Sequence, residues 1–397
     1  MHFSCPEIGG APRMLDTVRR VLVFVTVTIF VDAVLYGVVT PLVPGYVDDY
    51  HLSKFQAGLI VGAFGGGVLV GAIPSGIFAS RFGPKSAVVG GLLLLVVSSV
   101  TFGLAGSPEA LGISRFLQGI SSTTTWAGAL AWVTVLAPRE RRGQMLGTVF
   151  GFAVLGAILG PTFGATAELL GIRPTFLVVA AVGLVLTIAA VLSPTPPPET
   201  PSPGATGRAL RDPAFVLGLW LNTLPAIFFG VLALLAPLTL SARGYGAFAI
   251  GAVFLVAGVL ESALNPYIGR LADSRGTLLL IRVFLVASIV TGTALAVSVK
   301  SAIVVVFIVL ASIAYGALFT PGMALVSDRA DRSELSQGLA FGVMNGAWAL
   351  GQVIGSPAAG ALAGASGDTL SYLTCSLLCT VTLAITATRA VHGRAAV

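Results

Sequence analysis

Long apolar stretches recur along this chain from Val21 to Ala390, and few charged residues interrupt them. Such stretches hold about 20 residues, which as a helix cross a hydrocarbon layer about 30 Å thick. Only 10% of the 397 residues are charged, whereas ordinary soluble domains carry about 25%. Because so little polar surface cannot cover a soluble globule, we expect a multi-pass protein of the lipid bilayer.

The apolar stretches predict twelve membrane spans. Each is expected to be an α-helix, because lipid offers no partner for unpaired backbone groups and the alternating pattern of a β-barrel is missing. The first span is longer than the apolar run of about 7 to 15 residues in a cleaved signal peptide, so we expect it to stay as an anchor. The predicted spans cover residues 21–44, 55–79, 86–106, 109–136, 144–169, 174–192, 214–239, 246–270, 277–298, 301–326, 335–364 and 369–389.

The lysines and arginines predict the orientation of these spans. If both termini are cytoplasmic, 17 of the 22 lie in cytoplasmic segments, four lie in outer loops, and Arg115 lies within a span. The net charge of +6 therefore reflects topology, and the scattered basic residues argue against a nucleic-acid partner. Arginine outnumbers lysine 19 to three, which is typical of a GC-rich bacterium. We expect the inner membrane of a bacterial cell.

One polar segment, residues 193–213, divides the chain. It is rich in Pro, Ser and Thr, which predicts an extended cytoplasmic linker between two groups of six helices. The expected parts are a cytoplasmic tail at 1–20, six-helix bundles at 21–192 and 214–390, and a cytoplasmic tail at 391–397.

The two predicted bundles share an internal repeat. Four glycines of the fifth span and its approach recur 195 residues later, as Gly342, Gly346, Gly351 and Gly355. The loop "GIFASRFG" at 76–83 likewise matches "GRLADSRG" at 269–276. Elements six spans apart have the same orientation, so the bundles are pseudo-symmetric parallel repeats. Such repeats are typical of secondary transporters, in which the halves rock around a site near mid-membrane.

Three motifs carry a resemblance to a known family. They are "GIFASRFGPK" after the second span, "RFLQG" at 115–119 in the fourth, and "GAILGPTFGA" at 156–165 in the fifth. They are similar to the patterns G-x-x-x-D-R-x-G-R-K, R-x-x-x-G and G-x-x-x-G-P-x-x-G-G of the major facilitator superfamily, specifically its twelve-span drug:proton antiporter branch. The resemblance covers nearly the whole chain and implies an all-α integral membrane fold of two six-helix bundles.

The first motif and its counterpart in the second half supply candidate gating residues. The glycines permit a tight turn and a close helix approach, and Arg81 and Lys85 can meet carbonyls at helix C-termini. Ser80 stands where the family usually has Asp, while Asp273 keeps the acid in the second half. A plain basic turn that follows the orientation rule is the alternative. The candidate gating residues are Gly76, Arg81, Gly83, Lys85, Asp273, Arg275 and Gly276.

The third motif predicts close helix packing in the fifth span. Gly156, Gly160 and Gly164 are four residues apart and form one small stripe, while Pro161 bends the span. The resemblance makes this stripe the signature of the antiporter branch. It is the main reason to expect export by exchange.

Three ionisable residues, Asp32, Arg115 and Glu261, lie deep within spans. A charge at the bilayer centre costs about 2.5 to 3.5 kcal/mol, so such residues usually face a cavity or each other. By depth, Arg115 is the nearest plausible partner of Asp32, and Gln118 follows in the same motif. We expect Asp32 to bind a proton from outside and release it inward. A static Asp32 and Arg115 pair that only fixes packing is the alternative.

Glu261 is the candidate for a second proton or cation site, and a protonated Glu261 bonded to Asn265 is the alternative. Polar residues from Ser121 to Trp126 predict a wet face on the fourth span. Two deep acids against one deep base favour cationic or neutral amphipathic substrates, helped by aromatic faces. The candidate lining residues, each alone more often a packing residue, are Tyr36, Asn222, Phe228, Asn265, Tyr315, Phe319, Asn345, Trp348 and Gln352.

These features predict a proton-coupled secondary transporter that exports small organic compounds by alternating access. Protons are the expected coupling ion, with no other cofactor and no metal, and we expect a monomer. A proton symporter that imports a metabolite and, from another class, a membrane receptor or scaffold are the alternatives. An enzyme is not expected, because the three histidines lie outside the spans and no nucleotide, metal or nucleophile motif is present.

Overall fold

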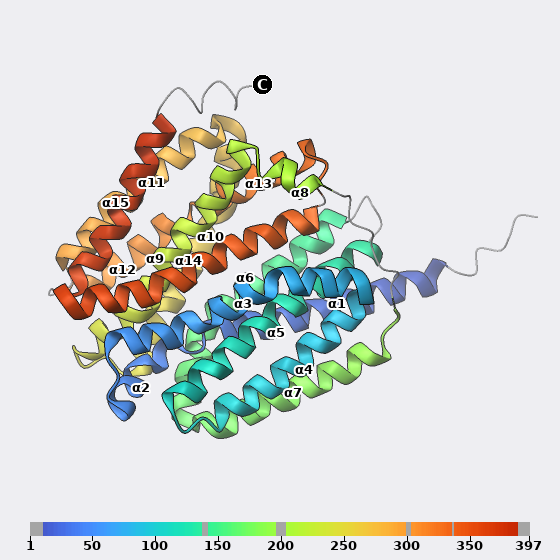
Figure 1. Cartoon of the computed structure of the whole chain (residues 1–397), viewed down its shortest axis with the longest axis horizontal. Coiled ribbons are helices and arrows are strands. Elements are labelled where there is room, and N and C mark those ends of the chain that lie inside the picture. The colour runs from blue at the N-terminus through green and yellow to red at the C-terminus, as the bar shows by residue number, and fades with distance from the viewer. Residues whose placement is uncertain (1–10, 137–141, 196–203, 299–302, 336, 388–397) are drawn as a thin grey trace, which may run out of the picture.

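The computed structural model describes residues 11–136, 142–195, 204–298, 303–335 and 337–387 (Figure 1). Within these ranges the regular elements are helices. The first half contains α1 (Ala11–Gly37), η1 (Thr40–Leu42), α2 (Val43–Tyr50), α3 (Lys54–Phe82), α4 (Pro84–Gly103), α5 (Pro108–Leu136), α6 (Arg142–Leu170) and α7 (Ile172–Leu192). The rest contains α8 (Ala205–Ala209), α9 (Pro213–Ser241), α10 (Ala247–Arg275), α11 (Thr277–Ser298), α12 (Val304–Gly316), α13 (Phe319–Arg332), α14 (Gln337–Ser366) and α15 (Asp368–Ala387).

Every predicted span falls on one or more of these helices, so the all-α membrane fold is confirmed. Ten helical stretches among the described residues are long and apolar enough to cross a membrane. The ten do not include α5 or α14. In α5, Arg115 and the run of Ser and Thr at 121–125 lower the apolar character of the helix. The predicted tail at 391–397 and residues 1–10 of the other tail lie outside the described ranges.

Two predicted spans are broken into shorter helices. The first consists of α1, η1 and α2, because Pro41 lacks a backbone N–H and restricts the residue before it. The tenth consists of α12 and α13, which Ala317 and Leu318 separate. Both breaks leave backbone carbonyls at the end of a helix, where side chains can reach them.

The sequence predicted an extended linker, but the structure shows that part of it is helical. Its later residues form α8, because most of the prolines of the linker precede Gly204. Ala205 and Ala209 are buried in a cluster with residues of α9, α13 and α14. Residues 196–203 of the linker lie outside the described ranges.

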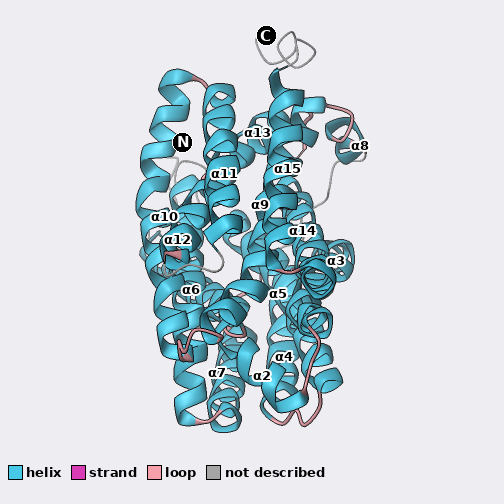
Figure 2. Ribbon diagram, turned by 90° about the vertical axis from the view of Figure 1, so that its left-hand side faces the viewer, coloured by secondary structure: helices cyan, strands magenta, loops and turns pink. Residues whose placement is uncertain are grey.

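The helices pack in two groups (Figures 1 and 2). In the first group α5 packs on α3 and α4, α6 on α1, and α7 on α4; in the second α14 packs on α9, α15 on α11, and α13 on α9. The groups meet chiefly where α3 lies along α14 and α6 along α10. These contacts are equivalent, since α3 and α10 are the second membrane helices of their groups and α6 and α14 the fifth. The domain bounds given above stay a prediction.

The glycine repeat in the sequence is also a repeat in packing. In the first group the stripe of α6 presses on successive carbonyl oxygens of α1, and a Cβ at Gly156 would lie 2.5 Å from the oxygen of Phe30. Gly351 of α14 stands in the same way against the carbonyl oxygen of Thr223 in α9. Gly351 is 195 residues after Gly156, and Thr223 is 193 after Phe30. The helices therefore approach backbone to backbone at matching places.

Candidate transport site

The Asp32 carboxyl of α1 is enclosed by α5. It is 4% exposed, and its Oδ2 accepts hydrogen bonds from Ser122 Oγ at 2.7 Å and Trp126 Nε1 at 2.8 Å. The two donors are four residues apart and so lie on one face of α5. Both residues belong to the run at 121–126 that was predicted as a wet face, but the serines and threonines of that run are buried. The bonding of these two donors to Asp32 was not predicted. The four-residue spacing of Ser122 and Trp126 was the one feature of the sequence that could have indicated a shared partner.

Arg115 does not pair with Asp32, which corrects the prediction. Its guanidinium donates to the carbonyl oxygens of Leu35 at 2.9 Å and Tyr36 at 3.1 Å, and to Gln118 Oε1 at 2.8 Å. Because α1 ends at Gly37, its last carbonyls have no partner within the helix. These oxygens take up the two terminal nitrogens of the guanidinium, and no ion pair between Arg115 and Asp32 forms.

An aromatic cluster joins the two groups of helices next to this arginine. The ring of Tyr36 from α1 lies 5.5 Å from that of Phe64 in α3 and 5.1 Å from that of Trp348 in α14. The guanidinium carbon of Arg115 lies 4.8 Å from the Phe64 ring centre. Tyr36 and Trp348 are half-buried, as is Asn345 one turn before Trp348. Tyr36 and Trp348, two of the predicted lining residues, thus lie in contact. Phe64 completes the cluster, and no sequence motif had indicated it.

The Glu261 carboxyl of α10 lies against the end of α12. A Cβ at Gly316 would collide with it, so a larger residue there would have to displace the Glu261 carboxyl. Glu261 is half-buried and has no hydrogen-bond or ion-pair partner among the residues that the structure describes. It acts electrostatically on Tyr36, which places it near the aromatic cluster. The Asn265 side chain lies outside the described part.

The other predicted lining residues pack inside the second group. Phe228 and Tyr315 are 0% exposed and stack with their ring centres 3.8 Å apart. Asn222 donates to the Gly218 carbonyl, and Gln352 to that of Ala226. Phe319 stacks on Phe229. In this conformation Phe228, Tyr315, Asn222 and Gln352 are core residues, because the two rings stack on each other, Asn222 bonds a carbonyl of its own helix and Gln352 bonds one of α9.

The two groups are held together at the end of the molecule that carries α2, the α2 end (lower left in Figure 1). Lys54 at the start of α3 forms an ion pair with Asp368 at the start of α15. A Cβ at Gly58 would lie 2.5 Å from the Ser356 carbonyl oxygen of α14, which shows the close approach there. Toward the opposite end, the α8 end, a Cβ at Gly346 of α14 would meet only the Ala72 Cβ, at 4.0 Å. Contact between α3 and α14 thus loosens toward the α8 end.

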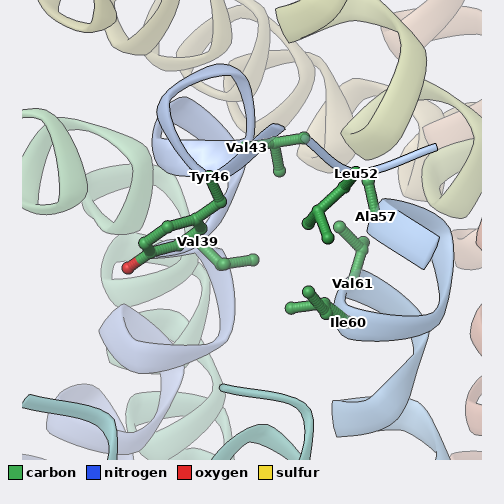
Figure 3. Close-up of a pocket in the computed structure, with 7 residues that line it drawn as sticks. All are labelled: Val39, Val43, Tyr46, Leu52, Ala57, Ile60 and Val61. Atoms are coloured by element: carbon green, nitrogen blue, oxygen red, sulfur yellow. The ribbon is translucent and has the colours of Figure 1, made fainter. Parts of the chain in front are cut away.

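Little space remains between α2 and α3. Figure 3 shows the side chains around a small apolar cavity, which come from α2, from α3, from the turn before η1 and from the loop between α2 and α3. This cavity has a volume of about 10 Å³. It holds at most a water molecule. The lining residues are Val39, Val43, Tyr46, Leu52, Ala57, Ile60 and Val61. A polar hollow of about 170 Å³ lies nearby, where Asp48 and Glu168 face residues at the junction of α9 and α10.

The candidate gating residues lie near the α8 end. Gly83 and Gly276 adopt φ of 88° and 90°, which favours glycine, so both tight turns are confirmed. Lys85 Nζ donates to the carbonyl oxygens of Val191 and Ser193 at 2.7 Å each, the predicted contact with a helix C-terminus. A Cβ at Gly76 would meet nothing within 4 Å, so this glycine does not serve a close helix approach.

The remaining candidate gating residues make few contacts that the structure describes. Arg81 and Arg275 are exposed, and the Arg81 guanidinium lies over the neighbouring Phe82 ring. The Asp273 side chain lies outside the described residues. The functional roles of all these side chains stay predictions.

Comparison with known proteins decides the family. The sequence profile of the Major Facilitator Superfamily matches residues 25–337. The chain belongs to this superfamily. Among curated relatives, Multidrug resistance protein 2 of Bacillus subtilis is 26% identical over 179 residues, which cover 45% of each chain. Quinolone resistance protein NorA of Staphylococcus aureus is 26% identical over 156 residues, 39% of this chain and 40% of that protein. The chain thus spans less than half the length of these relatives.

Solved structures share the fold of this major facilitator protein. A bacterial homolog to the human lysosomal transporter Spinster, inward-facing and unoccupied, has a TM-score of 0.77 and 16% identity, and the match covers 93% of this chain and 96% of that one. The nucleoside transporter NupG has a TM-score of 0.70 and 14% identity, over 92% and 98%. This likeness shows the fold alone. By family, the chain is a multi-pass membrane transporter and not an enzyme.

Proposed function

We propose that this major facilitator protein is a proton-coupled antiporter that exports small organic compounds by alternating access. The observation that carries the proposal is the Asp32 carboxyl, enclosed between α1 and α5 and bonded to two uncharged donors. No described residue forms an ion pair with it, so it can gain or lose a proton without breaking one. An intramembrane carboxyl of this kind is costly and suits a proton relay.

Export is supported by the relatives and by the fifth span. Several relatives are named for resistance to drugs, and the Gly156 to Gly164 stripe packs α6 on α1, the helix that carries Asp32. In the predicted orientation the α8 end is cytoplasmic, so the close packing at the α2 end corresponds to an inward-facing state. The proposal includes protons as the coupling ion, a monomer, and a bacterial inner membrane with both termini inside.

Cationic or amphipathic compounds are the proposed substrates. Tyr36, Phe64 and Trp348 offer ring faces at the junction of the two groups. Glu261 adds a carboxyl without a partner among the described residues near Tyr36. Aromatic faces and an unpaired carboxyl together suit an organic cation.

The test is Asp32→Asn in proteoliposomes with an imposed pH gradient. Asparagine keeps an acceptor oxygen for Ser122 and Trp126, so the protein should fold, but it cannot carry a proton. Proton-driven efflux of a fluorescent cation should be lost, while the exposed Asp49→Asn control keeps it. Proton-driven efflux at the wild-type rate in Asp32→Asn would contradict the proposal. A panel of cations, neutral drugs and sugars, tested on acidifying the lumen of inside-out vesicles, identifies the substrate class and separates export from import.

A further inference from the structure

The two oxygens of the Asp32 carboxyl have different surroundings. Oδ2 accepts both hydrogen bonds, from the Ser122 hydroxyl and from the Trp126 indole. Oδ1 accepts none from the residues that the structure describes. A carboxyl held by one oxygen cannot rotate freely, so its second oxygen keeps a fixed direction.

We propose that Ser122 and Trp126 are positioning residues that hold Oδ2 of Asp32 so that Oδ1 takes up and returns the transported proton. This inference rests on the proposed function. A hydronium ion gives its proton to a lone pair of Oδ1, which leaves a neutral carboxyl and water, and the reverse step restores the carboxylate. Because Oδ2 keeps acceptor capacity in both states, the two donors can hold the group throughout.

The neighbouring polar residues of α5 do not share this role. Ser121 donates to the Gly91 carbonyl of α4, and Thr124 donates to the Ile120 carbonyl of its own helix. Of the described hydroxyl and indole groups on α5, Ser122 and Trp126 are those bonded to a carboxylate. Their four-residue spacing is what places both donors on one oxygen.

Among the described residues, Arg115 is the charged side chain that interacts electrostatically with the Asp32 carboxyl. It lies on the same helix as the two donors, and its guanidinium is already bonded to Leu35, Tyr36 and Gln118. On α6 and α7 the described charged side chains that belong to spans, Glu168 and Arg173, lie at the α2 end, away from Asp32. The orientation of the carboxyl therefore depends on the two uncharged donors.

The experiment compares two kinds of transport in proteoliposomes of the full-length protein. Trp126→Phe keeps a ring but removes the indole donor, and Ser122→Ala removes the hydroxyl. Two matched controls lie on the same helix. Trp132→Phe removes a buried indole whose nitrogen has no partner among the described residues, and Ser114→Ala removes a hydroxyl that bonds only its own helix. The readouts are proton-driven efflux of a fluorescent cation and exchange of that cation without a pH gradient.

Each donor variant should lower driven efflux by about tenfold, as expected for one lost hydrogen bond to a charged group. Exchange needs no net proton transfer, so it does not depend on the orientation of the Asp32 carboxyl and should stay within about twofold of the wild type, equivalent to about 0.4 kcal/mol. Ser122→Thr, which keeps a hydroxyl, should restore driven efflux, and both controls should behave as the wild type.

Three results separate the possibilities. Wild-type driven efflux in both donor variants would overturn this inference, and so would an equal fall of driven efflux and exchange, which indicates lost packing. If Asp32→Asn also keeps driven efflux, the proposed function fails as well. If Asp32→Asn is inactive while the donor variants are normal, only the positioning role fails.

Discussion

Arg115 of α5 donates a hydrogen bond of 2.9 Å to the carbonyl oxygen of Leu35, where α1 comes to its end. The guanidinium also donates to the Tyr36 carbonyl oxygen and to Gln118 Oε1, so one side chain bonds three acceptors. It thereby fixes the end of the helix that carries Asp32. The geometry of the planar guanidinium fork matters here more than the charge alone.

Arg115→Lys should therefore destabilise the protein although it keeps the charge. A lysine ammonium is a point charge on a flexible stem and does not reproduce the fork. We expect a loss of about 2 kcal/mol, in the range of a hydrogen bond to a charged group. Thermal unfolding in detergent measures it, with the exposed Arg81→Lys as the control. Equal stability of both variants would contradict the role of the fork.

Gly156→Ala should push α1 away from α6. The added Cβ would lie 2.5 Å from the Phe30 carbonyl oxygen and 2.9 Å from the Ala33 Cβ. Overpacking of this kind costs about 1 to 3 kcal/mol. In contrast, Gly151→Ala on the same helix meets nothing within 4 Å. Its melting temperature should stay level or rise, since alanine favours a helix by up to about 1 kcal/mol. A similar fall in both would refute the packing explanation.

Removal of the ion pair between Lys54 and Asp368 should open the α2 end more often. A lysine in the first turn of a helix opposes the helix dipole, so the pairing with Asp368 compensates for its position. A single cysteine at Ile60, introduced after replacement of the natural cysteines, reports opening through reaction with an impermeant maleimide. Lys54→Ala should raise the labelling rate by a few-fold, as expected for a partly exposed pair of about 1 kcal/mol.

The charge swap provides the control for this pair. Lys54→Asp with Asp368→Lys should bring the labelling rate back toward that of the wild type. Lys54→Asp alone should label faster than Lys54→Ala. The Arg208 and Glu334 pair, which is exposed and joins α8 to the end of α13, should have no influence. If the swap labels as fast as the single variant, the pair does not hold this end closed.

Glu261→Gln should weaken the export of organic cations more than that of neutral compounds of similar size. The amide has nearly the same shape but removes the carboxyl charge that lies near Tyr36. We expect about a tenfold fall in apparent affinity for a cation, within the range for a desolvated charge contact. Gly316→Ala displaces the Glu261 carboxyl, so it should also weaken the export of cations more than that of neutral compounds. Equal losses for cations and neutral compounds would argue against a role in charge recognition.

Hydropathy predicted the helices because lipid leaves the backbone no other arrangement. The glycine spacing predicted the repeat, and the structure shows the carbonyls on which those glycines press. The partner of Asp32 was predicted wrongly, since depth in a helix does not tell which face a side chain occupies. The break after Gly37 also exposes carbonyl acceptors for Arg115 that no residue type reveals.

Contacts between distant segments were not predictable from one sequence. Lys54 and Asp368 are 314 residues apart, and nothing local to either residue indicates the other. Phe228 and Tyr315 were named as candidate lining residues because their rings could face a substrate, although each alone is more often a packing residue. The structure instead stacks them on each other in the core of the second group. Composition cannot distinguish a lining ring from a packed one.

The most direct measurement counts the protons that move when substrate moves. Proteoliposomes loaded with a pH-sensitive dye and given a gradient of a transported cation, with no initial pH difference, report this flux. The wild type should move protons against the direction of the cation, and Asp32→Asn should move none while it still exchanges the cation. Proton movement by Asp32→Asn at the wild-type ratio to cation would contradict the assignment of Asp32 as the coupling group.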